Sequence, residues 1–200
     1  MKVYDALYRF GYRPWERADR EPWASSVAQR LDREEAERSR PLGRVLDVGC
    51  GRGQYAPELV RRGWEVVGID YIPRAIEAAQ RRRITGATFL VGDVTDLPVD
   101  ELGTFGFFFD IGCFQHLNAG QRQAAGRGIT SLADPGATML IMAFAKSTPI
   151  GSFVTGASAD DVQAAFPEWD LLSVEAAETA TMDWPMSRMQ PQWMRLKRRQ

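Results

Sequence analysis

This sequence of 200 residues has no long apolar run, only two cysteines and almost no net charge. Its longest apolar stretch, residues 139–145, is far shorter than the roughly 20 residues of a membrane-spanning helix, so we interpret it as a buried strand. No apolar core of a signal peptide follows the first residues. The two cysteines, Cys50 and Cys113, are expected to be free thiols in a reducing cytoplasm, although they could lie near one another.

The formal net charge of −1 excludes an overall basic field that would attract nucleic acid, although residues 195–199 are locally basic. Metal-ligand patterns are also missing, because the single histidine, His116, has no second histidine and no closely spaced cysteine pair beside it. We therefore expect no metal, no membrane and no nucleic acid as partner. A monomer and a homodimer both stay open.

What is present is the composition of an ordinary globular protein, with 44% hydrophobic and 26% charged residues. The length suits a single domain over residues 1–200. Strand-like and helix-like segments alternate along most of the chain, which predicts a parallel sheet with helices on both faces. The expected strands are residues 45–49, 65–69, 88–91, 105–111 and 138–144, followed by a hairpin of 169–174 and 192–197. The expected helices are residues 24–38, 54–62, 73–83, 120–132 and 159–166.

Two of these helices carry signals of their own. Gly126 and Gly128 each cost about 1 kcal/mol inside a helix, so the helix over 120–132 could be broken. Ser158 is placed to cap the helix that follows it, with Asp161 at the third position of a near capping box.

A glycine-rich turn follows the first expected strand, in the run Asp47-Val48-Gly49-Cys50-Gly51-Arg52-Gly53. Such a turn lets the backbone approach a ligand closely. The second strand ends at Asp70, whose carboxylate can take two ribose hydroxyls. Together these features predict a site for an adenosine moiety.

The same turn fits a nicotinamide dinucleotide poorly, because Gln54 stands where that motif wants its third glycine. Asp47 has no role in binding a pyrophosphate, but it could orient the turn or meet an ammonium group, directly or through water. Asp93 follows the third strand, where its carboxylate can accept a hydrogen bond from an adenine amino group. Each acid alone could simply be a polar residue that ends a strand. Jointly they suit a ligand with donors along its length and no phosphates.

These motifs, over about residues 42–145, resemble those of class I S-adenosylmethionine-dependent methyltransferases. The resemblance implies an α/β fold: a Rossmann-like, seven-stranded, mostly parallel sheet with helices on both faces and an antiparallel last strand. It also implies an N-terminal lid and substrate segment (1–40), a cofactor-binding core (41–145) and a C-terminal substrate-side helix and hairpin (146–200). The cofactor would be S-adenosylmethionine, and S-adenosylhomocysteine would be the product.

The resemblance also implies roles for single residues. Asp70 would hold the ribose, Tyr71 or Ile72 would pack on the adenine, and Asp93 would face its amino group. The expected cofactor-binding residues are Asp47, Gly49, Cys50, Gly51, Gly53, Asp70, Tyr71, Ile72, Asp93, Val94, Asp110 and Trp15.

A narrower resemblance connects residues 109–117 and 13–16 to the thiopurine- and thiol-methyltransferase-like branch of small-molecule enzymes. One departure is Gly106, where many relatives carry an acid. We interpret it as a change at the start of the fourth strand, distant from the ligand.

His116 follows the fourth strand, and its ordinary pKa of about 6.5 suits a general base. The alternative is a surface or helix-starting histidine with no catalytic part, since methyl transfer from a sulfonium needs no base when the nucleophile is already unprotonated. Cys113 is expected to be small core filler, not a covalent nucleophile.

Aromatic residues suggest how an acceptor would be bound. Tyr8, Tyr12 and Trp15 could form a lid with π faces toward a sulfonium, or could merely pack the N-terminal helix on the sheet. Phe114 and Trp184 are further candidates for an apolar substrate pocket, or could only cover the core.

The function expected from these features is methyl transfer to an O, N or S atom of a small, aromatic or apolar molecule. Within the same class, an RNA methyltransferase is an alternative, suggested by the basic tail. A protein that binds S-adenosylmethionine without catalysis is a second alternative. A nicotinamide-dependent dehydrogenase is a third, and the glycine spacing speaks against it.

Overall fold

A computed structural model describes residues 21–145, 155–179 and 189–200 of the chain. Its strands are β1 (Arg44–Val48), β2 (Glu65–Asp70), β3 (Ala87–Val91), β4 (Phe105–Ile111), β5 (Ala133–Phe144), β6 (Trp169–Ala176) and β7 (Pro191–Arg198). Its helices are α2 (Trp23–Glu35), α3 (Ala56–Arg62), α4 (Pro73–Arg81), α5 (Val99–Leu102), α6 (Ala119–Leu132) and α7 (Ala159–Ala165), with a 3₁₀ turn η1 (Phe114–His116). Within these ranges, no helix is long and apolar enough to cross a membrane.

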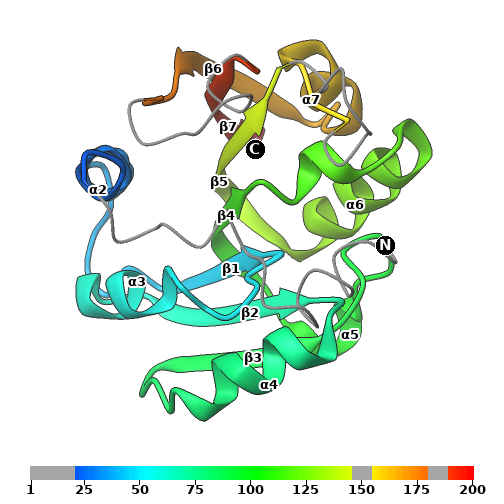
Figure 1. Cartoon of the computed structure of the whole chain (residues 1–200). Coiled ribbons are helices and arrows are strands. Elements are labelled where there is room, and N and C mark those ends of the chain that lie inside the picture. Colours follow the sequence, from blue (N-terminus) through cyan, green and yellow to red (C-terminus); the bar gives the residue numbers. More distant parts are fainter. Residues whose placement is uncertain (1–20, 146–154, 180–188) are drawn as a thin grey trace.

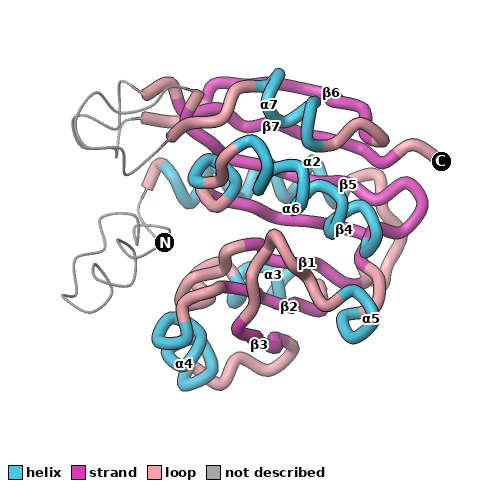
Figure 2. Tube along the Cα trace, turned by 90° about the vertical axis from the view of Figure 1, so that its right-hand side faces the viewer, coloured by secondary structure: helices cyan, strands magenta, loops and turns pink. Residues whose placement is uncertain are grey.

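The strands form one seven-stranded sheet in the order β3-β2-β1-β4-β5-β7-β6, which Figure 2 shows stacked from bottom to top. Strands β1 to β5 pair in parallel, whereas β7 runs antiparallel to both β5 and β6. This is the Rossmann-like sheet with an antiparallel last strand that the sequence predicts. Because parallel strands end at one edge, the turns after β1, β2 and β4 meet there.

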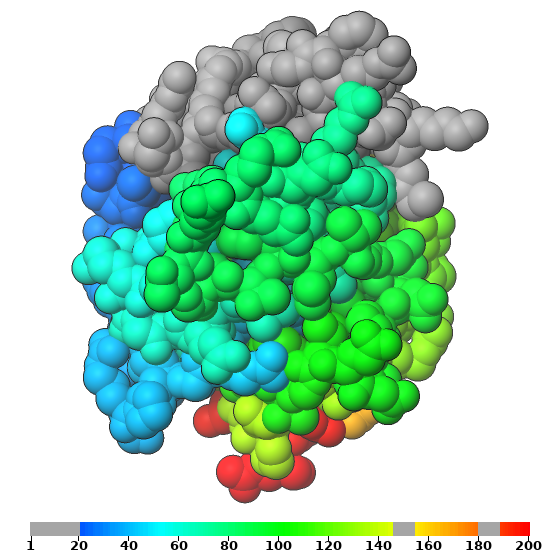
Figure 3. Space-filling model, turned by 90° about the horizontal axis from the view of Figure 1, so that it is seen from below, coloured from blue at the N-terminus to red at the C-terminus, as the bar shows by residue number. Residues whose placement is uncertain are grey.

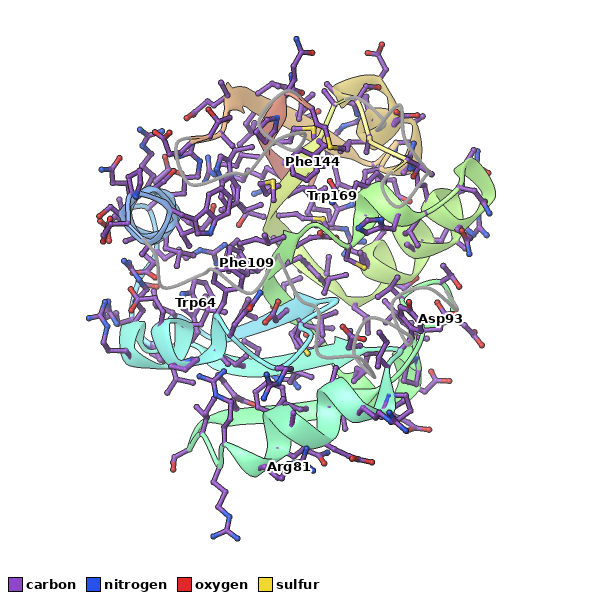
Figure 4. The ribbon with its side chains drawn as sticks, in the orientation of Figure 1. Trp64, Arg81, Asp93, Phe109, Phe144 and Trp169 are labelled. Atoms are coloured by element: carbon purple, nitrogen blue, oxygen red, sulfur yellow. The ribbon has the colours of Figure 1, made fainter. Side chains whose placement is uncertain are left out.

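Helices cover both faces of the sheet (Figure 1). One apolar cluster joins α2, α3 and α4 to the sheet and holds Trp64, Phe107 and Phe109. The other joins α5, α6 and α7 to the opposite face and holds Phe108 and Trp169. Figure 4 shows Trp64 and Phe109 on the α3 side and Trp169 toward α6. Two separate cores therefore fix the central strands from both sides.

Helix α6 is continuous, although two glycines lie within it. A Cβ atom at Gly126 would lie 2.0 Å from the carbonyl oxygen of Ala165, so glycine is what lets α7 approach α6 closely. The helix begins with a capping box between Asn118 and Gln121. Helix α7 begins with the expected cap, since Ser158 and Asp161 form a complete capping box.

The pairing of β4 with β5 shifts in register, because Phe105 lies opposite Ala133 and Phe107 opposite Thr138, so that the extra residues are in β5. Across this shift, Phe105 belongs to the α6 side of the core and Phe107 to the α3 side. Regular alternation would place both rings on one face. Gly106 lies at this irregularity, and its carbonyl accepts a 3.0 Å hydrogen bond from Arg38. Gly106 is therefore at the start of β4, remote from the edge where the strand ends.

A buried carboxylate on α2 binds this helix to the sheet, near the start of β4. Glu34 is 2% exposed and accepts hydrogen bonds from Arg38 at 2.7 Å and Arg195 at 2.9 Å. Thr138 of β5 donates a further hydrogen bond to the same carboxylate. Every charge in this cluster has a partner, so the cluster is structural.

Strand β3 forms one of the two edges of the sheet. Figure 3 views the molecule from below, where α4 and β3 contribute much of the visible surface. Among the described strands, β3 pairs with β2 alone, and its Leu90 and Val91 are 37% and 55% exposed.

Candidate functional site

The turn after β1 is built into the carboxyl edge of the sheet. The N–H groups of Gly49 and Cys50 both donate to the carbonyl of Ile69 in β2, at 2.8 and 3.0 Å. Gly51 then donates its N–H to the carboxylate of Asp70 at 2.9 Å. These hydrogen bonds hold residues 49–51 across the end of β2, so the turn has a fixed position relative to Asp70.

Glycine is required in this turn for steric reasons. Gly49 has a φ of +70°, and a Cβ atom there would lie 2.5 Å from the Cβ of Cys113. Gly53 has a φ of +65°, and a Cβ atom there would lie 2.6 Å from the ring of Phe89. There is thus no room for a side chain at either position, and the backbone of the turn lies directly against Cys113 and Phe89.

Asp70 connects the two turns that follow β1 and β2. Its Oδ2 accepts from Gly51 and its Oδ1 accepts from the N–H of Ile72, both at 2.9 Å. Burial raises the pKa of this carboxyl, and the two backbone hydrogen bonds oppose that rise. A carboxylate has about four acceptor positions, so each oxygen can still accept a ligand hydroxyl.

Asp47 and Asp110 are buried carboxyls on adjacent strands, 2% and 1% exposed. Burial raises the pKa of Asp47 to about 8, with smaller contributions from the charges of Asp110 and Asp70. Burial also raises the pKa of Asp110 to about 7. Among the described residues, Oδ2 of Asp47 has no hydrogen-bond partner. An orphaned buried oxygen of this kind suits a donor or cation that arrives with a ligand.

Asp110 differs from Asp47 because its carboxylate is occupied by the backbone. It accepts from the N–H of Cys113 at 2.9 Å and from the N–H of Phe114 at 3.1 Å. These bonds hold the start of η1 against the end of β4. The structure therefore gives Asp110 a role in shaping the turn that carries His116.

The remaining cofactor candidates lie around the ends of β2 and β3. Oδ1 of Asp93 accepts from both the N–H and the hydroxyl of Thr95, at 2.8 and 2.7 Å. Tyr71 is 36% exposed, whereas Ile72 and Val94 are 3% and 7% exposed. Tyr71 therefore presents a ring to the surface, and Ile72 and Val94 lie in the core.

Several predicted site residues lie outside the described residues: Tyr8, Tyr12, Trp15 and Trp184, together with the motif at 13–16. Phe114 is described, and it is a core residue. It is 1% exposed, and its ring centroid lies 5.8 Å from that of Phe166. Its contribution to a substrate pocket stays a prediction.

Both cysteines are free thiols, as expected. Burial raises the pKa of each, so both stay protonated at neutral pH and neither is an activated nucleophile. Across the described residues, no group of three metal-ligating side chains gathers.

Two buried residues near the site are not among the residues that the sequence analysis predicts for it. Tyr55 is 8% exposed, and its hydroxyl accepts a 3.1 Å hydrogen bond from Trp23 of α2. Gln115 is 4% exposed and lies between Phe114 and His116 in η1. Gln115 lies inside the segment 109–117, whose narrower resemblance is the signal that could have pointed to it.

Comparison with known proteins agrees with this geometry. Residues 45–136 match the family model described as a methyltransferase domain. The chain is 32% identical over 149 residues to a 2-heptyl-1-hydroxyquinolin-4(1H)-one methyltransferase of Mycobacteroides abscessus, a match covering 72% of this chain and 65% of that protein. It is 30% identical over 115 residues to a ubiquinone biosynthesis O-methyltransferase of Xanthomonas campestris pv. campestris, covering 56% of this chain and 47% of the relative. The matches thus span about half to two thirds of these relatives.

Among solved structures, the N-methyltransferase NodS from Bradyrhizobium japonicum in complex with S-adenosyl-L-homocysteine is similar over the full length of both chains. Its TM-score is 0.79 and its sequence identity 18%, a likeness of fold. Residues 45–136 are thus similar to a methyltransferase domain, and the chain as a whole has the fold of this N-methyltransferase.

Proposed function

We propose that this protein transfers a methyl group from S-adenosylmethionine to an oxygen atom of a small hydroxylated aromatic molecule. The observation that carries the proposal is Asp47, a buried carboxyl with an unpartnered oxygen beside the glycine-rich turn. A buried acid that lacks a partner destabilises a fold, so its presence at a ligand-binding edge favours a role in binding.

The described residues fit this cofactor. Asp47 would meet the ammonium group of its methionine part, close to the backbone of residues 49–53. Asp70 would accept the ribose hydroxyls on the acceptor positions that its backbone contacts leave. Both contacts from Thr95 fall on Oδ1 of Asp93, so Oδ2 would face the adenine amino group. The exposed ring of Tyr71 would stack on the adenine.

When bound, S-adenosylmethionine supplies a methyl group on a positively charged sulfur, which an acceptor takes by in-line displacement. The protein contributes alignment, which can lower a barrier by roughly 7 to 11 kcal/mol. It also excludes water from the reacting atoms. The backbone of residues 49–53 and the turn that Asp110 holds are the elements that would align the two reactants.

The choice of oxygen rests on the names of the relatives. One acts on a hydroxyquinolone, and another is an O-methyltransferase of ubiquinone biosynthesis. Acceptors with N or S atoms, including those of the thiopurine- and thiol-methyltransferase-like branch, are the competing outcomes. A reducing cytoplasm stays the expected compartment, and a monomer or homodimer the expected assembly.

The test is a coupled assay for S-adenosylhomocysteine release with a panel of hydroxyquinolones, phenols, thiols, amines and structured RNA. Turnover with a hydroxylated aromatic, and a methyl ether identified by mass spectrometry, are expected. Turnover only with thiols or RNA would replace the proposed acceptor. Cofactor binding without turnover on any member would instead indicate a binding protein.

His116 as a general base is a separate hypothesis within this function. If it removes a proton from the acceptor, His116→Ala should lower kcat by a factor of about 100 or more. A loss smaller than tenfold would refute the base role and leave the rest of the proposal intact.

A further inference from the structure

Gln115 is buried at the centre of η1 and is bound on several sides. Its side-chain Oε1 accepts a 2.7 Å hydrogen bond from the N–H of Phe144, at the end of β5. Its main-chain carbonyl accepts a hydrogen bond from the hydroxyl of Thr155. These contacts fix the side chain between the carboxyl ends of β4 and β5, where the candidate site lies.

The hydrogen bond from Phe144 also determines which way the amide of Gln115 points. The N–H of Phe144 can only donate, so it must face the amide oxygen; the amide nitrogen in that place would leave two donors opposed. The amide nitrogen Nε2 therefore projects the other way. There it lies 3.4 Å from Nε2 of His116. Gly112 leaves room for it, because a Cβ atom on Gly112 would lie 3.3 Å from this nitrogen.

An amide nitrogen has hydrogens to donate and no lone pair to accept with. The facing ring nitrogen of His116 must therefore be the acceptor, which requires an uncharged ring whose hydrogen is on Nδ1. We propose that Gln115 is a positioning residue that holds His116 as the neutral Nδ1–H form of the imidazole.

This assignment deepens the proposed function, on which its catalytic consequence rests. With the lone pair of Nε2 directed at Gln115 and Nδ1 already protonated, the ring of His116 is not set to take a proton from an acceptor. The assignment therefore opposes the general-base hypothesis for His116. The enzyme would then select acceptors whose hydroxyl ionises readily, since no side-chain base is provided by His116.

The assignment can be measured directly, because the chain has a single histidine. A long-range ¹H–¹⁵N spectrum of the full-length, ¹⁵N-labelled protein without cofactor or acceptor shows one imidazole. The expected pattern at neutral pH has a protonated Nδ1 and an unprotonated Nε2. The reverse pattern, or an imidazolium, would overturn the proposal, and neither result depends on methyl transfer.

Two variants test the role of Gln115 itself. Gln115→Glu keeps an oxygen for the N–H of Phe144 but turns a second oxygen toward His116, so the hydrogen is expected on Nε2. Gln115→Met removes both contacts, and the fixed Nδ1–H form is expected to be lost. Gln123→Glu is the matched control, since it adds the same charge at an exposed position of α6 and should leave the spectrum unchanged.

In the methyl-transfer assay, Gln115→Glu is expected to lower kcat/KM for the acceptor about tenfold, the cost of one hydrogen bond. The affinity for S-adenosylmethionine should stay within about twofold. An unchanged imidazole pattern in Gln115→Glu would refute the positioning role even if activity fell. Should the variants fail to fold, the wild-type spectrum alone decides the form of the ring.

Discussion

Glu34 and Asp47 are equally buried, at 2% exposure each, but their surroundings differ. Glu34 accepts hydrogen bonds from two arginines and a threonine. Asp47 has one oxygen without a partner among the described residues, and two other carboxyls raise its pKa beyond the effect of burial. Burial alone therefore does not show whether a carboxyl stabilises the fold or binds a ligand. The hydrogen-bond partners of the carboxyl distinguish the two roles.

The two acids also lie at opposite ends of the sheet. Glu34 binds Arg38, which in turn reaches the carbonyl of Gly106 at the start of β4. Asp47 lies next to the turn that follows β1. The end where the strands begin is thus built for stability, and the end where they finish retains unfavourable features that a ligand can relieve.

The largest effect should come from the structural acid. Glu34→Gln takes the buried countercharge from Arg38 and leaves Arg195 with the exposed Glu37 at 3.9 Å. Removing one partner of a buried ion pair costs roughly 3 to 5 kcal/mol. Because the arginine side chains are 19% and 24% exposed, we expect about 3 kcal/mol, the lower end of that range. Urea unfolding measures the loss as a lower midpoint.

Glu37→Gln is the matched control for this change. Glu37 approaches the same Arg195 at 3.9 Å, but its side chain is 74% exposed. Exposed pairs contribute about 0 to 1 kcal/mol, so the midpoint should hardly move. Equal losses in the two variants would show that burial at Glu34 is not what makes the pair strong.

A crowded glycine at the ligand edge should have an effect on stability of about the same size. Gly49→Ala places a methyl group 2.5 Å from the Cβ of Cys113, and overpacking of this kind costs about 1 to 3 kcal/mol. The φ of +70° adds about 1 to 2 kcal/mol for alanine. Calorimetry should show lower stability and weaker cofactor binding together.

Gly136→Ala separates the cost of the backbone conformation from the cost of overpacking. Gly136 has a similar φ of +74°, but a Cβ atom there would have nothing within 4 Å. Only the backbone cost should appear, about 1 to 2 kcal/mol, with cofactor affinity unchanged. If Gly136→Ala were as damaging as Gly49→Ala, close packing against Cys113 would not be the reason for glycine.

Asp47→Asn should affect binding without harming the fold. Losing a hydrogen bond to a charged group costs about 1.5 to 3 kcal/mol, so S-adenosylmethionine should bind roughly 10- to 100-fold more weakly. Stability should stay level or rise, because a buried acid disappears. Asp96→Asn, at an exposed position, is the control for charge. A destabilised Asp47→Asn with normal binding would make Asp47 structural after all.

The smallest effect is a dependence of binding on pH. Below about 8 the carboxyl of Asp47 holds its proton in the free protein, because burial raises its pKa. A bound ammonium group favours the carboxylate, so binding releases a proton and affinity rises with pH until that pKa is passed. For one proton the rise is at most about tenfold per pH unit.

Calorimetry in buffers of different ionisation enthalpy measures the released proton. Asp47→Asn should remove most of the release, and any remainder belongs to Asp110, whose pKa is raised to about 7. No release from the wild type would contradict the ammonium contact.

Most of the fold could be predicted because strand and helix periodicities are local properties of the chain. The pattern predicts β4 over the residues it occupies, 105–111, since its aromatic run is buried on both faces. It gives β5 too late a start, at 138 instead of Ala133, because Pro135 and Gly136 do not look like strand. It misses α5, whose four residues are too few for a helical period.

The candidate site is less predictable because its contacts are made between distant segments. The glycines and acids follow from their positions after strands. The contact between Gly126 and the carbonyl of Ala165 depends on how α7 packs, which no local pattern shows. The partners of Gln115 likewise come from β5 and from Thr155.

The register shift beside the start of β4 confines an irregularity to the end of the sheet that is remote from the site. The extra residues lie in β5, between Ala133 and Thr138, and the pairing is regular from Phe107 to Ile111. The strand therefore brings Asp110 to the backbone of Cys113 and Phe114 along a regularly paired segment. An insertion after Phe107 would instead exchange the two faces of the strand, because a one-residue shift reverses which side each residue faces.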